Sequence, residues 1–520
     1  MLRNGRRLTA FRAVRAISDE GNHLIATVSV RRPTGLGPMT RRTKVGFVLG
    51  AIVILALAVE TSVEAALGGN KLLLIVPISA FAGIGLFALS VVNFENFVFT
   101  TIAIRASLDI TKTGAGNGGA AGVNAATSSA AGLDPTGALA ILFIVAAFFW
   151  MLTRMRADRK SPPMSIHRVC LILFALAGFL SVIDSASVTV SALEALRVTA
   201  VVTMLAVLEV MLINREMIKR LIASIYVSSL VPVGYTLFNV LIHHSQFTSG
   251  GFSRFEGTFA QPNPFAIYLT MLIIMGVALL PHLTQKKKIA MSLLLVGCAI
   301  CLYFTFTRSA WIAAVVGVFA VAIMGRRRVM LGVMLVAVMI SLVAVPTILQ
   351  RFADLGNSTS ATGYASNSLA WRFDYWNQVL PLANKDPITG IGLNMSSLAT
   401  SQQKEPHNDF LRAYVETGVV GTIAYLALLV SMVLVARQAM KFTRRRMWSY
   451  ERSIAVGFAS CVIAFMLISL VSNVITQVVV LWYYVAFAAA AYAVTRYSEN
   501  AALLGLPPPV EEPAPALVGV

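Results

Sequence analysis

Residues 289–324 read IAMSLLLVGCAICLYFTFTRSAWIAAVVGVFAVAIM and hold two long apolar runs with Arg308 between them. Three lysines, Lys286–Lys288, precede this segment, and three arginines, Arg326–Arg328, follow it. A run of about 18 apolar residues can cross a hydrocarbon core of about 30 Å as an α-helix. Basic residues flanking such helices tend to stay in the cytoplasm. The pattern therefore predicts a pair of membrane-spanning helices, with Arg308 at the turn on the opposite face.

Similar apolar runs recur along the 520-residue chain, of which 57% is hydrophobic and only 12% is charged. A soluble domain carries roughly twice this share of charged residues. Only helices and closed barrels satisfy their backbone groups inside a bilayer, and these runs lack the alternation of barrel strands. The sequence predicts an all-α polytopic membrane protein with about 12–14 transmembrane helices. It also predicts a large extracytoplasmic loop that contains short helices.

The formal net charge of +19 does not indicate nucleic-acid binding, because the basic residues lie in short clusters between apolar runs. Placing every cluster in the cytoplasm requires an even number of spans between clusters. The segment 97–108 must then cross as a short helix after a tight turn at Asn93–Asn96, which gives about 14 spans. Both chain ends are predicted to be cytoplasmic. The four cysteines fall within apolar runs, so we interpret them as packing residues.

Five parts of the chain follow from these spans. They are a basic cytoplasmic N-terminal tail at 1–44, a first block of transmembrane helices at 45–348, an extracytoplasmic loop at 349–415, a last block of transmembrane helices at 416–496, and a disordered cytoplasmic tail at 497–520. Two further outer loops are expected at 109–135 and 243–263, and the first of them is rich in glycine and alanine. Translation from Met39 is an alternative to Met1.

A few cationic residues are predicted to lie on the outer face, namely Arg254, Arg308, Arg372 and His407. Arginine stays charged and binds phosphate with two hydrogen bonds, and histidine can transfer protons near neutral pH. Simpler interpretations stay open. Arg308 can be an anchor that reaches to the membrane surface, the aromatic residues around Arg372 can form an interfacial belt, and a single loop histidine can be incidental.

ATP is absent outside the cytoplasmic membrane, so a transferase there needs a donor that is already activated and already in the bilayer. A polyprenyl-diphosphate sugar is such a donor. Arginines would hold its diphosphate and stabilise the leaving charge, and His407 would accept a proton from the acceptor hydroxyl. No histidine or carboxylate cluster has metal-ligand spacing, and there is no GK[ST] loop or GxSxG. We therefore expect no metal and no cofactor.

The stretch WRFDYWNQVLPLANKDPITGIGLN (371–394), followed by EPHNDFLRAYVETGVVGTIAYLALL (405–429), resembles the signature region of the O-antigen ligase and polymerase superfamily. Upstream, FSRFEGTFAQPNPFAIYL (252–269) and FTFTRSAWIA (304–313) resemble the two earlier arginine motifs of that family. The resemblance covers roughly residues 220–440. The matching residues in the signature region are Arg372, Trp376, Pro387, Gly390, Gly392, His407, Asn408, Glu416, Gly418 and Gly421.

The resemblance implies a metal-independent glycosyltransferase in the bacterial cytoplasmic (inner) membrane that acts in cell-surface polysaccharide synthesis. Such enzymes take a glycan from undecaprenyl diphosphate and pass it, on the extracytoplasmic face, to a lipid-core sugar (a ligase) or to another lipid-linked repeat (a polymerase). The roles implied by analogy are catalysis by His407 and Arg308, diphosphate binding by Arg254, Arg308 and Arg372, and support of the acceptor or the site by Asn408, Glu416 and Trp376. His407 either accepts the proton or only orients the acceptor.

Two other classes of function, a transporter and a scaffolding protein, make different demands on the charged residues. A transporter or flippase for a lipid-linked glycan or another anionic substrate would place its cations near the bilayer midplane, yet the predicted spans hold few charges. A scaffolding protein would not need a histidine and three arginines on one face. The varied chemistry of the 349–415 loop favours the transferase.

Overall fold

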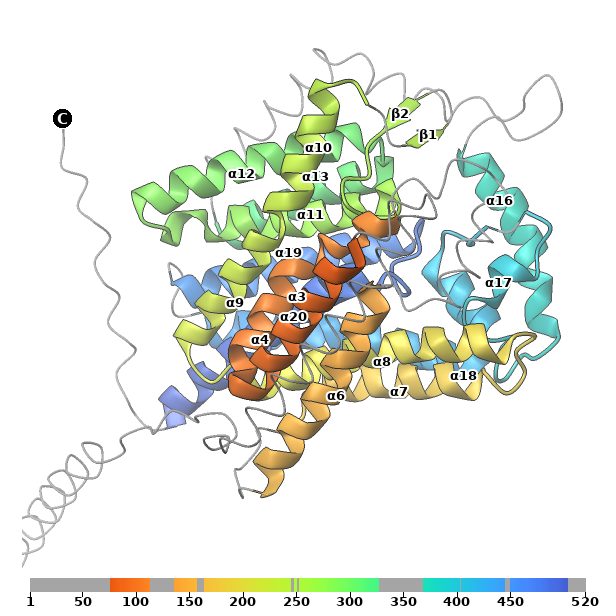
Figure 1. Cartoon of the computed structure of the whole chain (residues 1–520), viewed down its shortest axis with the longest axis horizontal. Helices are drawn as coiled ribbons and strands as arrows, with labels where there is room; N and C mark the ends of the chain where they lie inside the picture. Colours follow the sequence, from red (N-terminus) through yellow and green to blue (C-terminus); the bar gives the residue numbers. More distant parts are fainter. Residues whose placement is uncertain are drawn as a thin grey trace, which may run out of the picture. The chain divides into compact units, whose positions relative to one another are not determined.

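The computed structural model describes residues 75–112, 135–156, 163–244, 247–249, 252–326, 368–402, 404–444 and 449–503 (Figure 1). The chain divides into two compact units, 1–96 and 97–520. In the first unit, α3 (Ile75–Val92) ends at Asn93, whose side chain accepts a hydrogen bond from the backbone N–H of Asn96 at 3.0 Å. This N-cap begins α4 (Phe94–Arg105), which has 12 residues and is too short to count among the apolar spanning helices.

In the described part of the chain, eight helical segments are long and apolar enough to cross a membrane. They comprise α6 (Pro135–Arg156), α8 (Val188–Met211), the pair α9 (Arg215–Ser228) and α10 (Leu230–Leu241), α11 (Pro262–Leu279), α12 (Gln285–Phe304), α18 (Asp409–Phe442), α19 (Tyr450–Ser469) and α20 (Val478–Leu503). Shorter apolar helices include α7 (Ile166–Leu180) and α13 (Arg308–Met324). The predicted all-α polytopic membrane fold is confirmed. The predicted spans 45–59 and 329–348 lie outside the described residues, as do the segments 1–44 and 504–520.

The turn predicted around Arg308 is present. Helix α12 ends at Phe304 and α13 begins at Arg308, with Phe306 in the left-handed region at φ 49° between them. Other helix starts are set by side-chain caps. The side chains of Ser165, Asn214 and Ser449 accept hydrogen bonds from backbone N–H groups three residues later, at the starts of α7, α9 and α19. These residue types are the preferred N-caps because a short oxygen-bearing side chain satisfies an otherwise unpaired donor.

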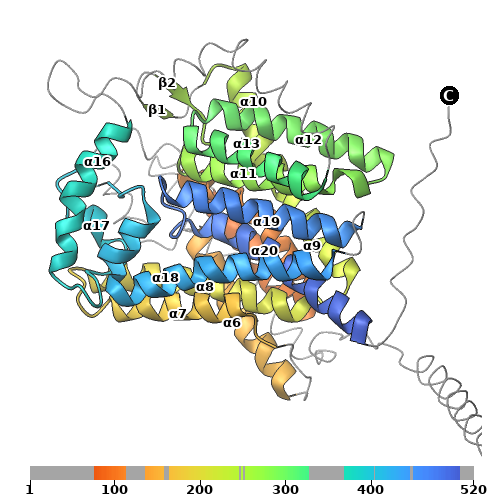
Figure 2. The ribbon, with the colours of Figure 1, turned by 180° about the vertical axis from the view of Figure 1, so that it is seen from behind.

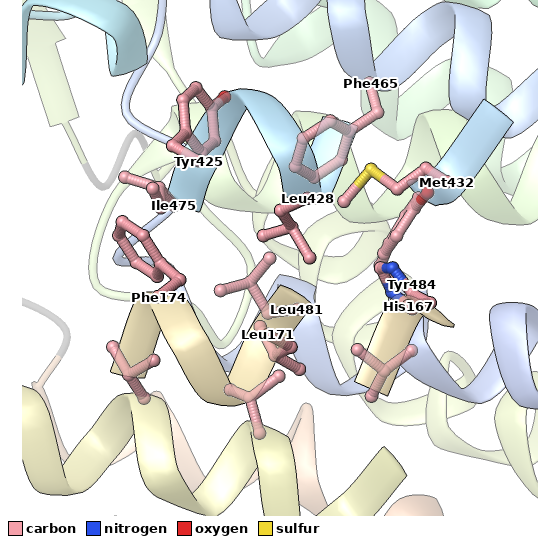
Figure 3. Close-up of a pocket in the computed structure, with 13 residues that line it drawn as sticks. His167, Leu171, Phe174, Tyr425, Leu428, Met432, Phe465, Ile475, Leu481 and Tyr484 are labelled. Carbon is pink, nitrogen blue, oxygen red and sulfur yellow. The ribbon is translucent and has the colours of Figure 1, made fainter. Parts of the chain in front are cut away.

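The core of the second unit is built from α7, α8, α11 and α18–α20. Helix α18 lies beside α7, and both views show the pair side by side (Figures 1 and 2). A cavity of about 20 Å³ lies among these helices, lined mostly by apolar side chains together with His167 and Tyr484 (Figure 3). A space of this size holds at most about one water molecule, so it is no binding site for a glycan.

The described part of the long loop forms three short helices, α16 (Ser368–Val379), η5 (Leu380–Asn384) and α17 (Met395–Leu398). Figures 1 and 2 show α16 and α17 gathered near the end of α18 at which that helix begins. Helix α18 starts at Asp409, so it includes the last residues of the segment predicted as loop 349–415. The predicted short helices in this loop are confirmed.

Candidate functional site

The start of α18 is anchored by two consecutive residues. The side chain of Asn408 caps the helix, accepting hydrogen bonds from the N–H groups of Phe410 and Leu411 at 3.0 and 3.1 Å. The buried carboxylate of Asp409 accepts hydrogen bonds from the N–H groups of Val474 and Ile475 at 2.9 and 3.1 Å. The second pair of bonds joins α18 to the turn between α19 and α20. His407, which comes directly before the cap, is therefore held close to that turn.

A break inside α18 admits the segment that precedes α17. Gly418 has φ 63° and ψ −163° within the helix, a conformation that glycine alone adopts readily. The freed backbone groups pair with the incoming segment. Val419 N–H donates to the carbonyl of Pro387 at 2.9 Å, and Gly392 N–H donates to the carbonyl of Glu416 at 3.0 Å. The Pro…Gly-x-Gly stretch and the Glu-x-Gly stretch of the sequence are thus two sides of one contact.

Replacing Gly418 with alanine is expected to destabilise the protein by more than about 3 kcal/mol, because the added Cβ combines strain with a clash. An ideal Cβ there lies 2.2 Å from the carbonyl oxygen of Ile388, which is backbone and cannot rotate away. The measurement is thermal unfolding in detergent, with Gly234→Ala as the control, since a Cβ at Gly234 meets nothing within 4 Å. Equal unfolding temperatures for the two variants would show that the break tolerates a side chain.

An arginine that the sequence analysis did not single out lies at the centre of the site's support. Arg412 is 1% exposed. Its guanidinium pairs with Glu416 Oε2 at 3.0 Å and with Glu405 Oε1 at 3.1 Å. It also donates to Thr476 Oγ1 at 2.8 Å and to Asn394 Oδ1 at 3.1 Å. The i,i+4 spacing of Arg412 and Glu416 was the available sequence signal.

Glu416, predicted to support the site or the acceptor, is fully buried beneath it. Besides Arg412, its carboxylate accepts hydrogen bonds from the N–H of Asn394 at 2.8 Å and from the hydroxyl of Ser396. Asn394 has φ 64°, so this contact also holds a strained turn after the Pro…Gly-x-Gly stretch. We infer that Glu416 supports the site by holding Arg412 and the turn at Asn394 in place.

His407 is held by an amide on the far turn. Asn473 Nδ2 lies 3.0 Å from His407 Nδ1 and donates to Glu405 Oε2 at 2.8 Å. Burial raises the pKa of Glu405, but the charge of Arg412 and the hydrogen bonds from Arg412 and Asn473 act together with the neighbouring His407 to outweigh burial, and the net pKa is lowered. An ionised Glu405 can only accept, so the NH₂ group of Asn473 must face it. The same NH₂ group then donates to Nδ1 of His407, which leaves the proton of the neutral imidazole on Nε2.

The electrostatic surroundings of His407 keep its ring neutral. Burial and, to a smaller extent, the charge of Arg372 lower its pKa to about 4, although Glu405 acts in the opposite direction. The ring of Trp371 packs edge-on against it, with 5.9 Å between the ring centroids. His407 itself has φ 53°, in the left-handed region that non-glycine residues enter rarely. Its position is thus set by surrounding contacts.

Helix α16 holds in place the segment that leads to His407. Trp376 Nε1 donates to the carbonyl of Pro406 at 2.6 Å, and Trp371 Nε1 donates to Gln402 Oε1 at 2.6 Å. The hydroxyl of the buried Tyr375 donates to the carbonyl of Lys404. We name these contacts the aromatic clamp, formed by Trp371, Tyr375 and Trp376. The clamp gives the aromatic residues a role beyond that of an interfacial belt.

Arg372, on the same helix, carries a half-buried charge. Its Nε is buried and has no hydrogen-bond partner in the described part of the chain. Burial, together with the smaller effect of the nearby charge of Arg308, lowers its pKa to about 10. Arg308, Arg372 and His407 therefore lie within electrostatic reach of one another, although they come from α13, α16 and the loop before α18.

Arg254 is bonded to the turn that precedes Arg308. It ends β2 (Phe252–Arg254), which pairs antiparallel with β1 (Phe247–Ser249). Its Nε donates to the carbonyl of Thr305 at 2.7 Å, and its Nη2 donates to Asn263 Oδ1 at 2.9 Å and to Thr307 Oγ1 at 3.0 Å. These bonds hold the turn from which Arg308 begins α13.

Comparison with known proteins agrees with the motifs. No curated protein matches the chain. Residues 291–426 match the model of the O-Antigen ligase family, and this range contains Arg308, Arg372 and His407. The match supports the resemblance of the motifs to the O-antigen ligase and polymerase superfamily, and the apolar helices are those of a polytopic membrane protein.

Proposed function

We propose that the protein transfers a glycan from an undecaprenyl-diphosphate donor to an acceptor hydroxyl on the extracytoplasmic face of the bacterial inner membrane, with both chain ends in the cytoplasm. The observation that carries the proposal is the charge of Arg372, which is half-buried, has a buried Nε without a partner in the described residues, and faces the like charge of Arg308. An anion bound by both arginines would offset their mutual repulsion and the partial desolvation of Arg372. A diphosphate at the membrane surface supplies that charge.

Arg308 and Arg372 would bind the diphosphate oxygens and stabilise the negative charge that grows as the bond from the anomeric carbon to the diphosphate breaks. The acceptor oxygen forms the new bond to that carbon, and its proton passes to water or to the released diphosphate. Arg254 supports this arrangement by fixing the turn before Arg308. The residues needed are cationic, which supports transfer without a metal or a nucleotide.

His407 supports the reaction best as a hydrogen-bond donor. With Nδ1 accepting from Asn473, the neutral ring presents an Nε2–H group, whereas a general base at Nε2 would need that nitrogen unprotonated. Of the two roles implied by the family resemblance, this geometry favours orientation of the acceptor.

The proposal is tested with purified protein, an undecaprenyl-diphosphate glycan and candidate acceptors, in EDTA and without nucleotide. We expect transfer by the wild type and by Lys385→Ala, an exposed change directly after η5, and loss of transfer in Arg308→Ala. Growth of a lipid-core acceptor identifies a ligase, and growth of a second lipid-linked repeat identifies a polymerase. Absence of transfer, together with Arg308-dependent passage of labelled lipid-linked glycan across proteoliposomes, would replace the proposal with transport.

The pH dependence of transfer follows from the lowered pKa of His407. With a pKa of about 4, the ring is neutral from about pH 5 upward, so kcat/KM is expected to stay constant between about pH 5.5 and 8 with respect to this group. A bound diphosphate would raise the pKa, so the acid limb of kcat lies at higher pH than that of kcat/KM. A limb of kcat/KM centred near 6.5, lost in His407→Ala, would contradict the buried, neutral imidazole.

Asn473→Asp tests the tautomer of His407. A carboxylate at this position can only accept, so it draws the proton to Nδ1 and leaves Nε2 without one. If His407 acts as a donor, we expect transfer to fall roughly tenfold, as for other residues that orient a functional histidine. Asn377→Asp, an exposed change on α16, is the matched control. Transfer by Asn473→Asp at or above the wild-type rate would instead assign His407 as the general base.

A further inference from the structure

A second cationic pocket lies at the other end of α18 from His407. Its volume is about 550 Å³, and it lies between the last third of α18, most of the length of α19 and the end of α13. The cations that line it are Arg326, Arg437, Lys441, Arg444 and Arg452. Because α18 is long enough to span a membrane, this pocket and the His407 site belong to opposite membrane faces.

The charges of this pocket are not balanced by the described protein. No carboxylate of the described residues forms an ion pair with any of the five cations. Glu451, the nearest acidic residue in the sequence to Arg452, pairs with Arg215 of α9 at 3.1 Å. Arg452 is only 8% exposed, and its Nη1 donates to the carbonyl of Met440 at 2.8 Å. Its Nε is buried without a hydrogen-bond partner among the described residues, which leaves a donor for an anion.

The rest of the pocket is apolar and is ordered along the helices. On α18 the lining residues change from Val433 and Ala436 to the cations further along the chain. On α19 the order is reversed, from Arg452 to the apolar residues Val462, Ile463 and Met466. The two helices are consecutive and lie side by side (Figure 2), so their cations share one end and their apolar residues share the other. Val433 and Ile463 are 36% and 38% exposed.

We propose that this pocket binds an anionic phospholipid. The cations hold the phosphate of the headgroup, and an acyl chain lies along the exposed apolar residues of α18 and α19. Basic pockets between transmembrane helices suit anionic headgroups, and each cation near the surface strengthens binding by about 1 kcal/mol, which is about fivefold. A free phosphate would use the cations but not the apolar wall. The site is separate from the proposed transfer chemistry and stands without it.

The experiment compares phosphatidylglycerol, phosphatidylcholine and inorganic phosphate as ligands of the purified full-length protein in detergent. Binding is followed by native mass spectrometry and by the rise in unfolding temperature. The test variant is Arg437→Gln/Lys441→Gln/Arg444→Gln, whose three side chains are all exposed. The matched control is Lys286→Gln/Lys287→Gln/Lys288→Gln at the start of α12, which removes the same charge from exposed positions outside the pocket. Unfolding without added lipid checks that both variants are folded.

We expect phosphatidylglycerol to bind and stabilise the wild type and the control more than phosphatidylcholine does. The test variant should lose about fivefold in affinity for each charge removed. Three results would overturn the proposal: equal binding of the two lipids, equal weakening in the test variant and the control, or stabilisation by inorganic phosphate as strong as that by phosphatidylglycerol. The last result would assign the pocket to a free anion.

Discussion

Replacing Arg372 with alanine is expected to reduce glycan transfer by about 10²–10³-fold while leaving the protein at least as stable as the wild type. The loss of rate follows from removal of a cation that would stabilise the leaving diphosphate. The gain or absence of change in stability follows from the folded state, in which Arg372 is partly buried, has a buried Nε without a partner in the described residues, and is repelled by Arg308. Removing such a charge relieves both costs. Transfer rates and unfolding temperatures in detergent measure the two effects.

Two further variants make this result specific. Lys385→Ala, which removes an exposed cation from the same loop, is expected to leave both rate and stability unchanged. Arg372→Lys keeps the charge but loses the two-pronged geometry, so a partial loss of rate is expected. If Arg372→Ala unfolds at a clearly lower temperature than the wild type, Arg372 is structural and its assignment to the diphosphate fails.

Replacing Arg412 with alanine is expected to lower the free energy of unfolding by about 3–5 kcal/mol. This result contrasts with Arg372→Ala, which is expected to lose transfer rate without losing stability. Arg412 has two carboxylate partners and two neutral acceptors, and it is 1% exposed. Its removal leaves the buried Glu416 and the half-buried Glu405 without their shared counter-charge. Because Glu405 also binds Asn473, which positions His407, transfer is expected to be lost together with the fold. Unfolding in mixed micelles of increasing SDS content gives the free energy.

The control for Arg412 is another arginine with a helical ion pair but more exposure. Arg197 pairs with Glu194 at 2.8 Å, and its side chain is 42% exposed. Because Arg197 is partly solvated although Glu194 is buried, Arg197→Ala is expected to cost less than Arg412→Ala, whose removal affects two carboxylates. Similar losses for the two variants would mean that the Arg412 network adds nothing beyond a single half-buried pair.

Much of the architecture could be predicted because the bilayer imposes simple rules on a sequence. Apolar runs and basic clusters located the helix pair around Arg308, and the varied loop before α18 indicated short helices near the surface. The motif order indicated a resemblance to the family, and the match of residues 291–426 to the family model supports it. These features depend on short stretches of chain, whose helical tendency and charge are visible without knowing what they contact.

The hydrogen bonds and ion pairs within the site could not be predicted in the same way. Asn473 lies in a short connection between two apolar runs, 66 positions from His407, and no local pattern joins the two. Arg412 is in the quoted signature stretch, but the predicted site was built from cations expected on the outer face. A buried arginine did not fit that description. The roles of Arg308, Arg372, His407 and Asn408 as site residues stay predictions that the variants above test. Position 418 shows most clearly why such contacts are not visible in the sequence. Glycine is required there because of the carbonyl of Ile388, which lies 30 positions earlier in the chain.

The aromatic clamp has a thermodynamic consequence for substrate binding. A free loop loses about 1–2 kcal/mol of conformational entropy for each residue whose backbone becomes ordered. The hydrogen bonds from Tyr375 and Trp376 hold the backbone at Lys404 and Pro406, and that from Trp371 holds the side chain of Gln402, so this cost is met when the protein folds. The affinity for donor and acceptor is then not reduced by ordering this segment, and the two substrates meet an imidazole whose direction is already set.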